Sequence, residues 1–282
     1  MLLSSIIWDI DPIMFSIGGR DVRWYGFLLA TGFLIGYLIL GNTMRKEGYK
    51  QTIIDKFAIT IIIGVVVGLR LGHCLFYGPY FDVIDETGKI IEEGYLNHPL
   101  NMLKVWEGGL ASHGGAIGIL LAIFIFSKRR KISYLELLDK VVLVVPLAGS
   151  MVRLGNLMNS EIIGIPTNVS WGFVFSRLGH DYPSHPTQLY EAIFYLTMFF
   201  VFYFIYKKYH SGWKHGTFLG WFMIILFGFR YIIEYTKIDP IEFTWNFPLN
   251  MGQLLSIPFI LVGAFFLWRE YAGKTKSNVP ME

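Results

Sequence analysis

The chain has 282 residues, of which 54% are hydrophobic, 17% aromatic and only 16% charged. This composition is too apolar for an ordinary soluble domain, and the length is too great for a single membrane span. The one cysteine, Cys74, lies in an apolar stretch and has no second cysteine to pair with. A disulfide framework and a CxxC metal or redox site are therefore excluded, and the composition indicates a polytopic membrane protein.

Seven apolar segments predict seven transmembrane helices in an all-α integral membrane protein, organised as one membrane domain over 1–282. The predicted spans are 22–41, 53–77, 110–126, 134–156, 186–206, 217–235 and 249–271. The amphipathic stretch before the first span lacks the pattern of a signal peptide and is expected to lie at the membrane interface. The longest connection, 78–109, is polar and acidic, and no internal repeat is visible.

The orientation follows from the lysines and arginines in the connections. One alternating set of connections holds 13 of these cations, whereas the other set holds five. Because cytoplasmic loops carry the excess of positive charge, the N-terminus is expected outside and the C-terminus in the cytoplasm. The acidic connection 78–109 is then extracytoplasmic.

The end of the fourth predicted span carries an unusual set of polar side chains. At about 100° per residue, Arg153, Asn156 and Ser160 fall on one helical stripe, whereas Asn159 and Glu161 diverge from it in opposite directions. One straight helix therefore cannot direct all of them at one ligand. Charged and amide groups at this depth are costly to desolvate and usually face a bundle interior or a water-filled cavity.

We therefore expect the helix to break within 155–160, with Gly164 and Pro166 providing the turn that follows. The alternative interpretation is that Arg153 extends from the helix end to the membrane surface and that the asparagines cap the helix.

The predicted topology places the polar residues of every span near its outer end. They are Tyr25, Arg70, His113, Arg153, Asn156, Asn159, Glu161, Gln188, Tyr190, Glu191, Arg230, Glu234, Asn250 and Gln253. A purely structural bundle would scatter or omit such residues. Their position favours one water-accessible cavity that opens toward the outer leaflet.

Two arginines in this set are suited to a phosphate. Arg230, Glu234 and Lys237 have helical spacing, so they stack on one face, and the simplest interpretation is an ion pair that holds the helix end. The functional interpretation is that Arg230 and Arg153 hold one phosphate between two planar guanidinium groups, with Glu234 orienting Arg230.

His113 has two open interpretations. It can be a satisfied interfacial residue, or it can accept a proton from a thiol, as an imidazole does near neutral pH. Gly114 and Gly115 follow it and would let a bulky substrate approach the backbone. No second histidine or cysteine lies at metal-ligand spacing from it, so no metal site is expected.

The motifs together resemble the bacterial prolipoprotein diacylglyceryl transferases, in order along almost the whole chain. The matching segments are Trp24-Tyr25-Gly26, Arg70, His113-Gly114-Gly115, Arg153 with Asn156, Asn159, Glu161 and Gly164, His185-Pro186 with Gln188-Leu189-Tyr190-Glu191, and Arg230 with Glu234. The chain departs from the family pattern at Val152, Ser160, Ser184 and Lys237. An arginine is usual in the family at positions 184 and 237.

The resemblance implies transfer of an sn-1,2-diacylglyceryl group from phosphatidylglycerol to the lipobox cysteine thiol in a prolipoprotein signal peptide, with release of glycerol 1-phosphate. It implies a multi-pass protein of the bacterial inner membrane with an extracytoplasmic site, no cofactor, no metal and no nucleic-acid partner. The implied catalytic residues are His113, Arg153, Glu161 and Arg230, and either His113 or Glu161 takes the thiol proton. The implied phosphatidylglycerol-binding residues are Tyr25, Arg70, Gly114, Gly115, Asn156, Asn159, Gly164, Gln188, Tyr190, Glu191 and Glu234.

Two other classes of protein have seven or more membrane helices. A retinal photoreceptor needs a lysine in the middle of its last helix, and 249–267 contains none. A transporter would show repeated halves and polar residues through the full membrane depth, and this chain has neither.

Overall fold

The computed structural model describes residues 6–104, 109, 111–238 and 249–277. The chain forms two compact units, which are described separately. The first unit comprises 1–40 and 138–282, and the second comprises 41–137.

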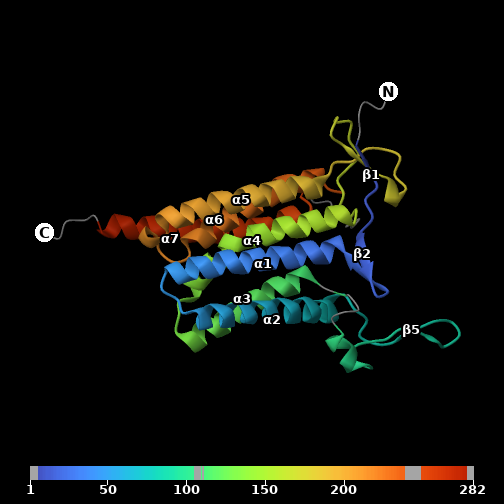
Figure 1. The fold of residues 1–282 in the computed structure, drawn as a ribbon, viewed down its shortest axis with the longest axis horizontal. Helices are drawn as coiled ribbons and strands as arrows, with labels where there is room; N and C mark the ends of the chain where they lie inside the picture. The colour runs from blue at the N-terminus through green and yellow to red at the C-terminus, as the bar shows by residue number, and fades with distance from the viewer. Residues whose placement is uncertain (1–5, 105–108, 110, 239–248, 278–282) are drawn as a thin grey trace. The chain divides into compact units, whose positions relative to one another are not determined.

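Seven α-helices occur in the described part of the chain, each at a predicted span (Figure 1). They are α1 (Trp24–Lys46), α2 (Gln51–Phe76), α3 (Ser112–Arg130), α4 (Tyr134–Met158), α5 (Thr187–Tyr209), α6 (Thr217–Ile233) and α7 (Met251–Ser277). Among the described residues, six of these helices are long and apolar enough to cross a membrane, and α3 is not one of them. The chain is therefore a multi-pass helical membrane protein.

The composition of α3 explains why it differs. The helix has 19 residues, about 28 Å at 1.5 Å per residue, which is close to the thickness of a hydrocarbon core. However, it begins with Ser112 and His113, contains three glycines and ends in Lys128, Arg129 and Arg130. These residues lower its mean hydropathy.

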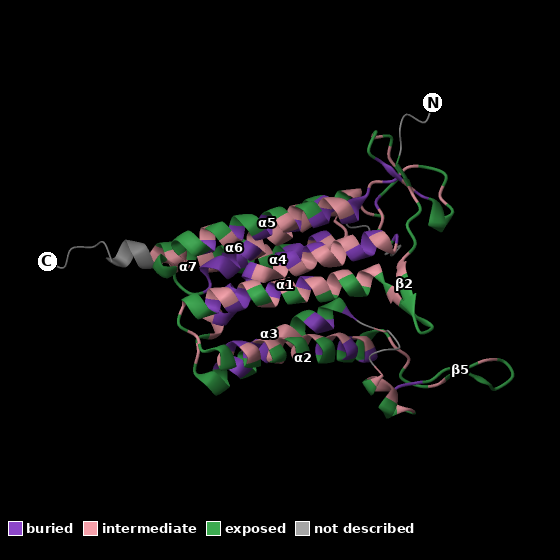
Figure 2. Ribbon diagram, viewed as in Figure 1, coloured by how far each residue is buried: buried purple, intermediate pink, exposed green. Residues whose placement is uncertain are grey.

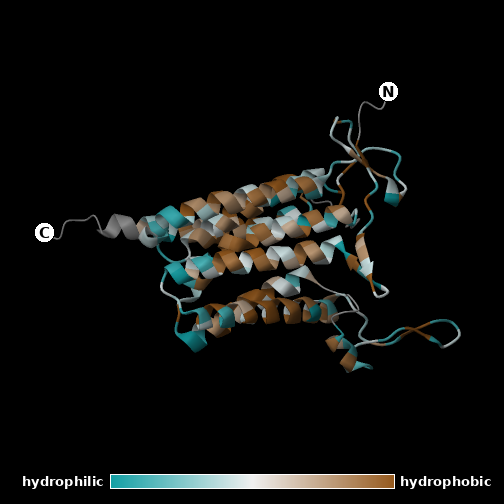
Figure 3. Ribbon diagram, viewed as in Figure 1, coloured by the Kyte–Doolittle hydropathy of each residue, from teal (hydrophilic) through white to brown (hydrophobic). Residues whose placement is uncertain are grey.

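The apolar surface of the helices faces outward, as expected for contact with lipid. On α2 only 17% of the apolar window is buried within the protein, and Figure 2 shows many exposed residues along this helix. Figure 3 shows that the same helix is strongly hydrophobic. Ile62, Ile63 and Val67 are each about half exposed, at 49%, 57% and 48%. Soluble proteins rarely expose such continuous apolar surface.

Small residues bring the helices of the first unit close together. A Cβ at Gly32 of α1 would lie 3.1 Å from the Met151 side chain of α4. The Ser150 hydroxyl of α4 donates a hydrogen bond of 2.8 Å to the backbone oxygen of Ala192 in α5. A Cβ at Gly220 of α6 would lie 3.0 Å from the backbone oxygen of Gly263 in α7. Close packing of small residues is the usual basis of helix association in membranes.

Short strands close one end of the first unit, in stretches that the sequence did not predict to be strands. Strand β1 (Ile6–Trp8) pairs in parallel with β6 (Phe173–Phe175), and β2 (Ile13–Ile17) pairs antiparallel with β3 (Arg20–Arg23). The Trp8 ring stacks on Phe173, and its Nε1 donates to the backbone oxygen of Leu157 at 3.0 Å. Strands β1 and β6 therefore pack on the last turn of α4.

The second unit consists of the end of α1, the helices α2 and α3, the predicted extracytoplasmic connection and the start of α4. That connection contains the hairpin β4 (Val83–Ile84) and β5 (Ile90–Glu92), followed by the 3-10 helix η1 (Pro99–Leu103). Figure 1 shows the hairpin beyond the end of α2.

Candidate active site

The polar cluster begins where α4 ends. The helix ends at Met158, and the backbone turns through Ser160 and Ile162, whose φ angles are 55° and 56°. The predicted break in 155–160 is confirmed. A left-handed conformation costs about 1–2 kcal/mol for a residue with a side chain and is unusual for a β-branched isoleucine. The turn therefore carries strain on both sides of Glu161.

This turn brings together side chains that a straight helix would separate. The Asn156 amide donates to one carboxylate oxygen of Glu161 at 2.8 Å, and the Asn159 amide donates to the other at 3.1 Å. Asn156 is itself 6% exposed, whereas Glu161 is exposed. Two donors fix the orientation of a carboxylate that remains accessible.

A buried carboxylate links the end of α4 to two other segments. Glu191 of α5 has no exposed surface, and its oxygens pair with Arg153 Nε and Lys237 Nζ, each at 3.0 Å. The Tyr195 hydroxyl lies 3.5 Å from the same carboxylate. A buried charge requires such partners because its desolvation is costly.

The cluster continues to the end of α6. Lys237 also pairs with Glu234 at 3.1 Å, and Arg230 Nε lies 3.7 Å from the same carboxylate. This Nε atom is buried and has no hydrogen-bond acceptor among the described residues. The chain of ion pairs thus joins three cations through two carboxylates, with Arg153 and Arg230 at its two ends.

The start of α5 packs on the same turn. The Gln188 amide donates to the backbone oxygen of Glu161, and Gln188 is fully buried. The Tyr190 hydroxyl is hydrogen-bonded to Trp171 Nε1 at 2.8 Å and to His185 Nδ1 at 3.1 Å. Gln188 therefore supports the turn, and Tyr190 belongs to an adjacent group of polar rings.

Two glycines allow the segments around the cluster to approach. A Cβ at Gly155 would lie 2.7 Å from the ring of Tyr25, which places that tyrosine of α1 against the last turns of α4. A Cβ at Gly164 would lie 2.6 Å from the His185 Cβ and 2.6 Å from the backbone oxygen of Thr236. Gly164 therefore allows the chain beside Lys237 to lie against the start of α5.

In the second unit, Arg70 is held by the backbone of its own connection. It is 5% exposed, and it donates to the oxygens of Met102 at 3.1 Å, Gly109 at 3.4 Å and Asn101. Its guanidinium also lies 5.4 Å from the ring centre of Tyr95. These contacts assign Arg70 a structural function, and its role with substrate stays a prediction.

The motif His113-Gly114-Gly115 at the start of α3 has two parts. Its glycines contact α2, and its histidine ring is exposed. A Cβ at Gly114 would lie 2.2 Å from the backbone oxygen of Gly68, and one at Gly115 would lie 2.8 Å from the Leu69 side chain. The space beside both glycines is therefore occupied by α2, while His113 is exposed. Substrate contact by the glycines stays a prediction.

Sequence reasoning underestimated two residues of this cluster. Lys237 is central to the ion pairs although it departs from the family pattern, and Tyr195 lies one turn after Glu191 in an apolar run that gave no signal. Asn250 and Gln253 form a reciprocal capping box at the start of α7, with hydrogen bonds of 3.1 and 2.9 Å. Within the described residues, no group of three or more metal-ligating side chains is present.

The membrane-spanning helices and the buried, ion-paired cluster at their ends define an integral membrane protein with a candidate functional site, because charged residues within membrane helices usually mark such a site. The family model of prolipoprotein diacylglyceryl transferases matches residues 12–269. The chain belongs to this family.

Relatives from several bacteria are similar over nearly their full length, and each is named phosphatidylglycerol–prolipoprotein diacylglyceryl transferase. The protein of Chloroherpeton thalassium is 40% identical over 267 residues, covering 94% of both chains. That of Tolumonas auensis is 42% identical, covering 92% of this chain and 95% of its own. That of Bacteroides fragilis is 37% identical, covering 98% of each.

Proposed function

We propose that this chain transfers the diacylglyceryl group of phosphatidylglycerol to the lipobox cysteine of a prolipoprotein, which is the first step of lipoprotein maturation. A carbon–sulfur bond forms at the glyceryl carbon that carried the phosphate, and the carbon–oxygen bond to that phosphate breaks. The thiol proton goes to a base, and the bonding electrons leave with glycerol 1-phosphate. The nucleophile belongs to the peptide, so the enzyme itself needs no reactive cysteine.

The departing phosphate gains negative charge, and we assign its stabilisation to Arg153 and Arg230. Planar guanidinium groups match phosphate oxygens, and preorganised cations are most effective where charge develops in the transition state. Glu191, Lys237 and Glu234 hold the two arginines in position through the ion pairs at 3.0–3.7 Å. These three are positioning residues in this proposal.

His113 and Glu161 are the two candidates for the base. Glu161 is accessible and oriented by two amides, whereas His113 is an exposed imidazole, the side chain best suited to take a proton near neutral pH. The other residues that the family resemblance implies for phosphatidylglycerol binding remain part of this proposal. They are Tyr25, Arg70, Gly114, Gly115, Asn156, Asn159, Gly164, Gln188 and Tyr190.

The proposed topology has seven spans, with α3 as the third, in one membrane domain of the bacterial inner membrane. The N-terminus lies outside and the C-terminus in the cytoplasm, so the ends of α4 and α6 and the starts of α1, α5 and α7 lie on the extracytoplasmic side. A translocated signal peptide presents its lipobox cysteine on that side.

The observation that carries this proposal is the ion-paired chain from Arg153 to Arg230 in a member of this transferase family. The test is an assay of the purified protein in detergent with phosphatidylglycerol and a lipobox peptide. We expect the peptide to gain the mass of a diacylglyceryl group and glycerol 1-phosphate to appear in equal amount. A peptide with serine in place of cysteine is the control. Solute flux in vesicles without lipid turnover would contradict the proposal.

A further inference from the structure

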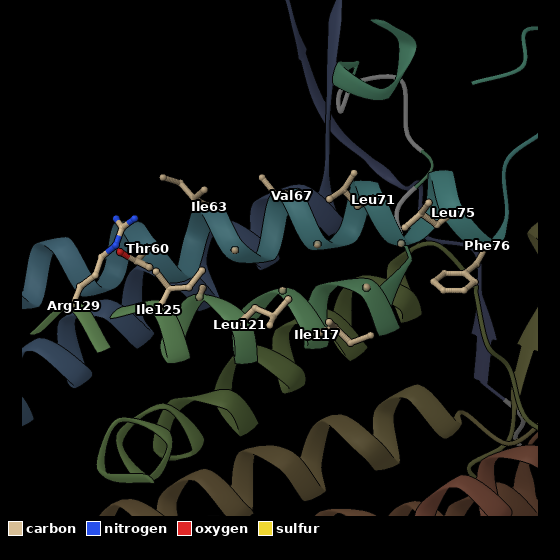
Figure 4. A pocket seen from close by; sticks show the side chains of 16 residues that line it. Thr60, Ile63, Val67, Leu71, Leu75, Phe76, Ile117, Leu121, Ile125 and Arg129 are labelled. Atoms are coloured by element: carbon tan, nitrogen blue, oxygen red, sulfur yellow. The ribbon is translucent and has the colours of Figure 1, made fainter. Parts of the chain in front are cut away.

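An apolar groove runs along the contact between α2 and α3 in the second unit (Figure 4). Its volume is about 540 Å³, within the range of ligand pockets. Thr60, Val67 and Leu71 of α2 and Ile117, Leu121 and Ile125 of α3 are among the residues that line it. The groove has the length of several helix turns and almost no polar lining.

The groove exists because the two backbones touch. A Cβ at Gly64 would lie 2.8 Å from the backbone oxygen of Gly118, and one at Gly68 would lie 2.4 Å from that of Gly114. Because the contact is made by glycines and by the small side chain of Ala122, the flanking leucines and isoleucines form the walls of the groove (Figure 4). Filling the floor of the groove would require the helices to separate.

A cation lies at one end of the groove (Figure 4). Arg129 lines it and is exposed. The neighbouring cations lie over rings of their own helix, Lys128 at 5.5 Å from the centre of Phe124 and Arg130 at 5.9 Å from that of Phe126. Among the described residues, Arg129 has no ion pair, hydrogen bond or ring contact. A guanidinium beside an apolar channel matches a phosphate attached to a hydrocarbon chain.

We infer that this groove binds an anionic phospholipid, with an acyl chain between α2 and α3 and the phosphate on Arg129, as a resident lipid that is not consumed. Arg129 lies 16 residues after His113, about 24 Å along α3 at 1.5 Å per residue. A lipid whose phosphate is at Arg129 therefore cannot present that phosphate at His113. Its headgroup lies in the leaflet where Lys128, Arg129 and Arg130 lie.

Charge and solvation favour a lipid over a peptide. Signal peptides carry a basic segment before their apolar segment, and three consecutive cations at the end of α3 would repel it. Within a bilayer an apolar groove gives little preference by itself, because lipid tails are available everywhere. The preference must come from the headgroup, and one cation near an anionic lipid corresponds to about a fivefold preference.

The test uses the full chain in phosphatidylcholine nanodiscs that contain a trace of lipid with a photoreactive diazirine in its acyl chain. The probe is phosphatidic acid or phosphatidylcholine with the same chain, and mass spectrometry locates the labelled residues. We expect phosphatidic acid to label Val67, Leu71 and Leu121 about fivefold more than phosphatidylcholine does. Labelling at Leu120, which does not line the groove, should show no such preference.

Matched variants separate a built site from diffuse attraction. Arg129→Gln should reduce the headgroup preference to about one, whereas Arg130→Gln should leave it unchanged. Leu121→Trp should block groove labelling, whereas Leu120→Trp should not, and both residues are exposed in the native protein. Equal labelling by the two lipids, or an equal effect of Arg129→Gln and Arg130→Gln, would overturn the inference. Neither result depends on transferase activity.

Discussion

Lys237 Nζ lies 3.0 Å from Glu191 Oε1, although the two residues are 46 positions apart in the sequence. Glu191 has no exposed surface, and its second oxygen pairs with Arg153. The start of α5, the end of α4 and the segment after α6 are thus held by one carboxylate. Removing that charge leaves two cations without their common partner.

Glu191→Gln should lower the free energy of unfolding by about 3 kcal/mol, because breaking a buried ion pair leaves uncompensated charge. Turnover should fall at least 100-fold, since a small displacement of catalytic groups costs about this much. Thermal unfolding in detergent and the transferase assay measure the two effects. Glu86→Gln, at an exposed carboxylate of the hairpin, is the control and should change neither.

Combining Glu191→Gln with Lys237→Met tests whether the pair acts as a unit. The double variant should recover part of the stability, because it removes one of the unpaired cations, but it should not recover turnover. Strictly additive losses of stability would contradict the arrangement described for these residues.

Arg153→Lys and Arg230→Lys should each reduce kcat about 100-fold although the charge is kept. A lysine is a point charge and cannot present two parallel donors to a phosphate. Arg177→Lys, which alters an exposed ion pair of 3.7 Å with Asp11, is the matched control and should have no effect. Near native turnover in both active-site variants would refute their assignment to the phosphate.

Hydrophobic patterning was sufficient to predict where the helices lie. For example, α4 was expected over 134–156 and occupies Tyr134–Met158, and α5 was expected over 186–206 and occupies Thr187–Tyr209. The break after α4 was predictable because its polar residues cannot share one helical face. Strands β1 and β6 were not predictable, because they are three residues each and pair across more than 160 positions.

The residues of the candidate site were predicted less completely than the positions of the helices. Arginines, glutamates and asparagines in apolar sequence stand out, so Arg153, Glu161 and Arg230 were noticed from their residue type, and the family resemblance implied their catalytic roles. Their partners depend on tertiary contacts that spacing does not encode. The sequence therefore did not reveal that Lys237 bridges two carboxylates. It also did not reveal that the Arg70 guanidinium donates hydrogen bonds to backbone oxygens.

A comparison of His113→Gln with Glu161→Gln should show which of the two residues accepts the thiol proton. If His113 takes the proton, His113→Gln retains phosphatidylglycerol binding and loses turnover at pH 7. Because the pKa of a free thiol is about 8.5, the thiolate fraction rises roughly tenfold per pH unit below that value. The rate of this variant should therefore rise with pH more steeply than the native rate. Loss of lipid binding, or a native pH profile, would exclude His113 as the base.

Gly164→Ala should lower both stability and turnover. The added Cβ would lie 2.6 Å from the backbone oxygen of Thr236, so the segment that carries Lys237 must move. Such overpacking costs about 1–3 kcal/mol. Gly228→Ala in α6 is the control, since no atom lies within 4 Å of its added Cβ, and it should be neutral or slightly stabilising. Equal behaviour of the two variants would contradict the role of Gly164.

Cysteine labelling in intact cells tests the proposed orientation. Glu86→Cys and Arg130→Cys are introduced separately in a Cys74→Ala background, and an impermeant maleimide should label the first from outside and the second only after permeabilisation. Glu86 is preferable to Asp85, because hydrogen bonds from the Thr87 hydroxyl and from the backbone of Lys89 and Thr87 lower the pKa of Asp85 and form the turn. Labelling of Arg130→Cys from outside would show that the orientation is the reverse of the proposed one.

The glycine contact between α2 and α3 also bears on how this pair of helices responds to temperature. Glycines have no rotamers to lose, so bringing these backbones together costs no side-chain entropy at the contact. The association then depends on dispersion forces and on weak Cα–H···O bonds, which do not require water to be expelled. The helix pair should therefore keep its geometry on warming better than two helices in contact through long, freely rotating side chains would.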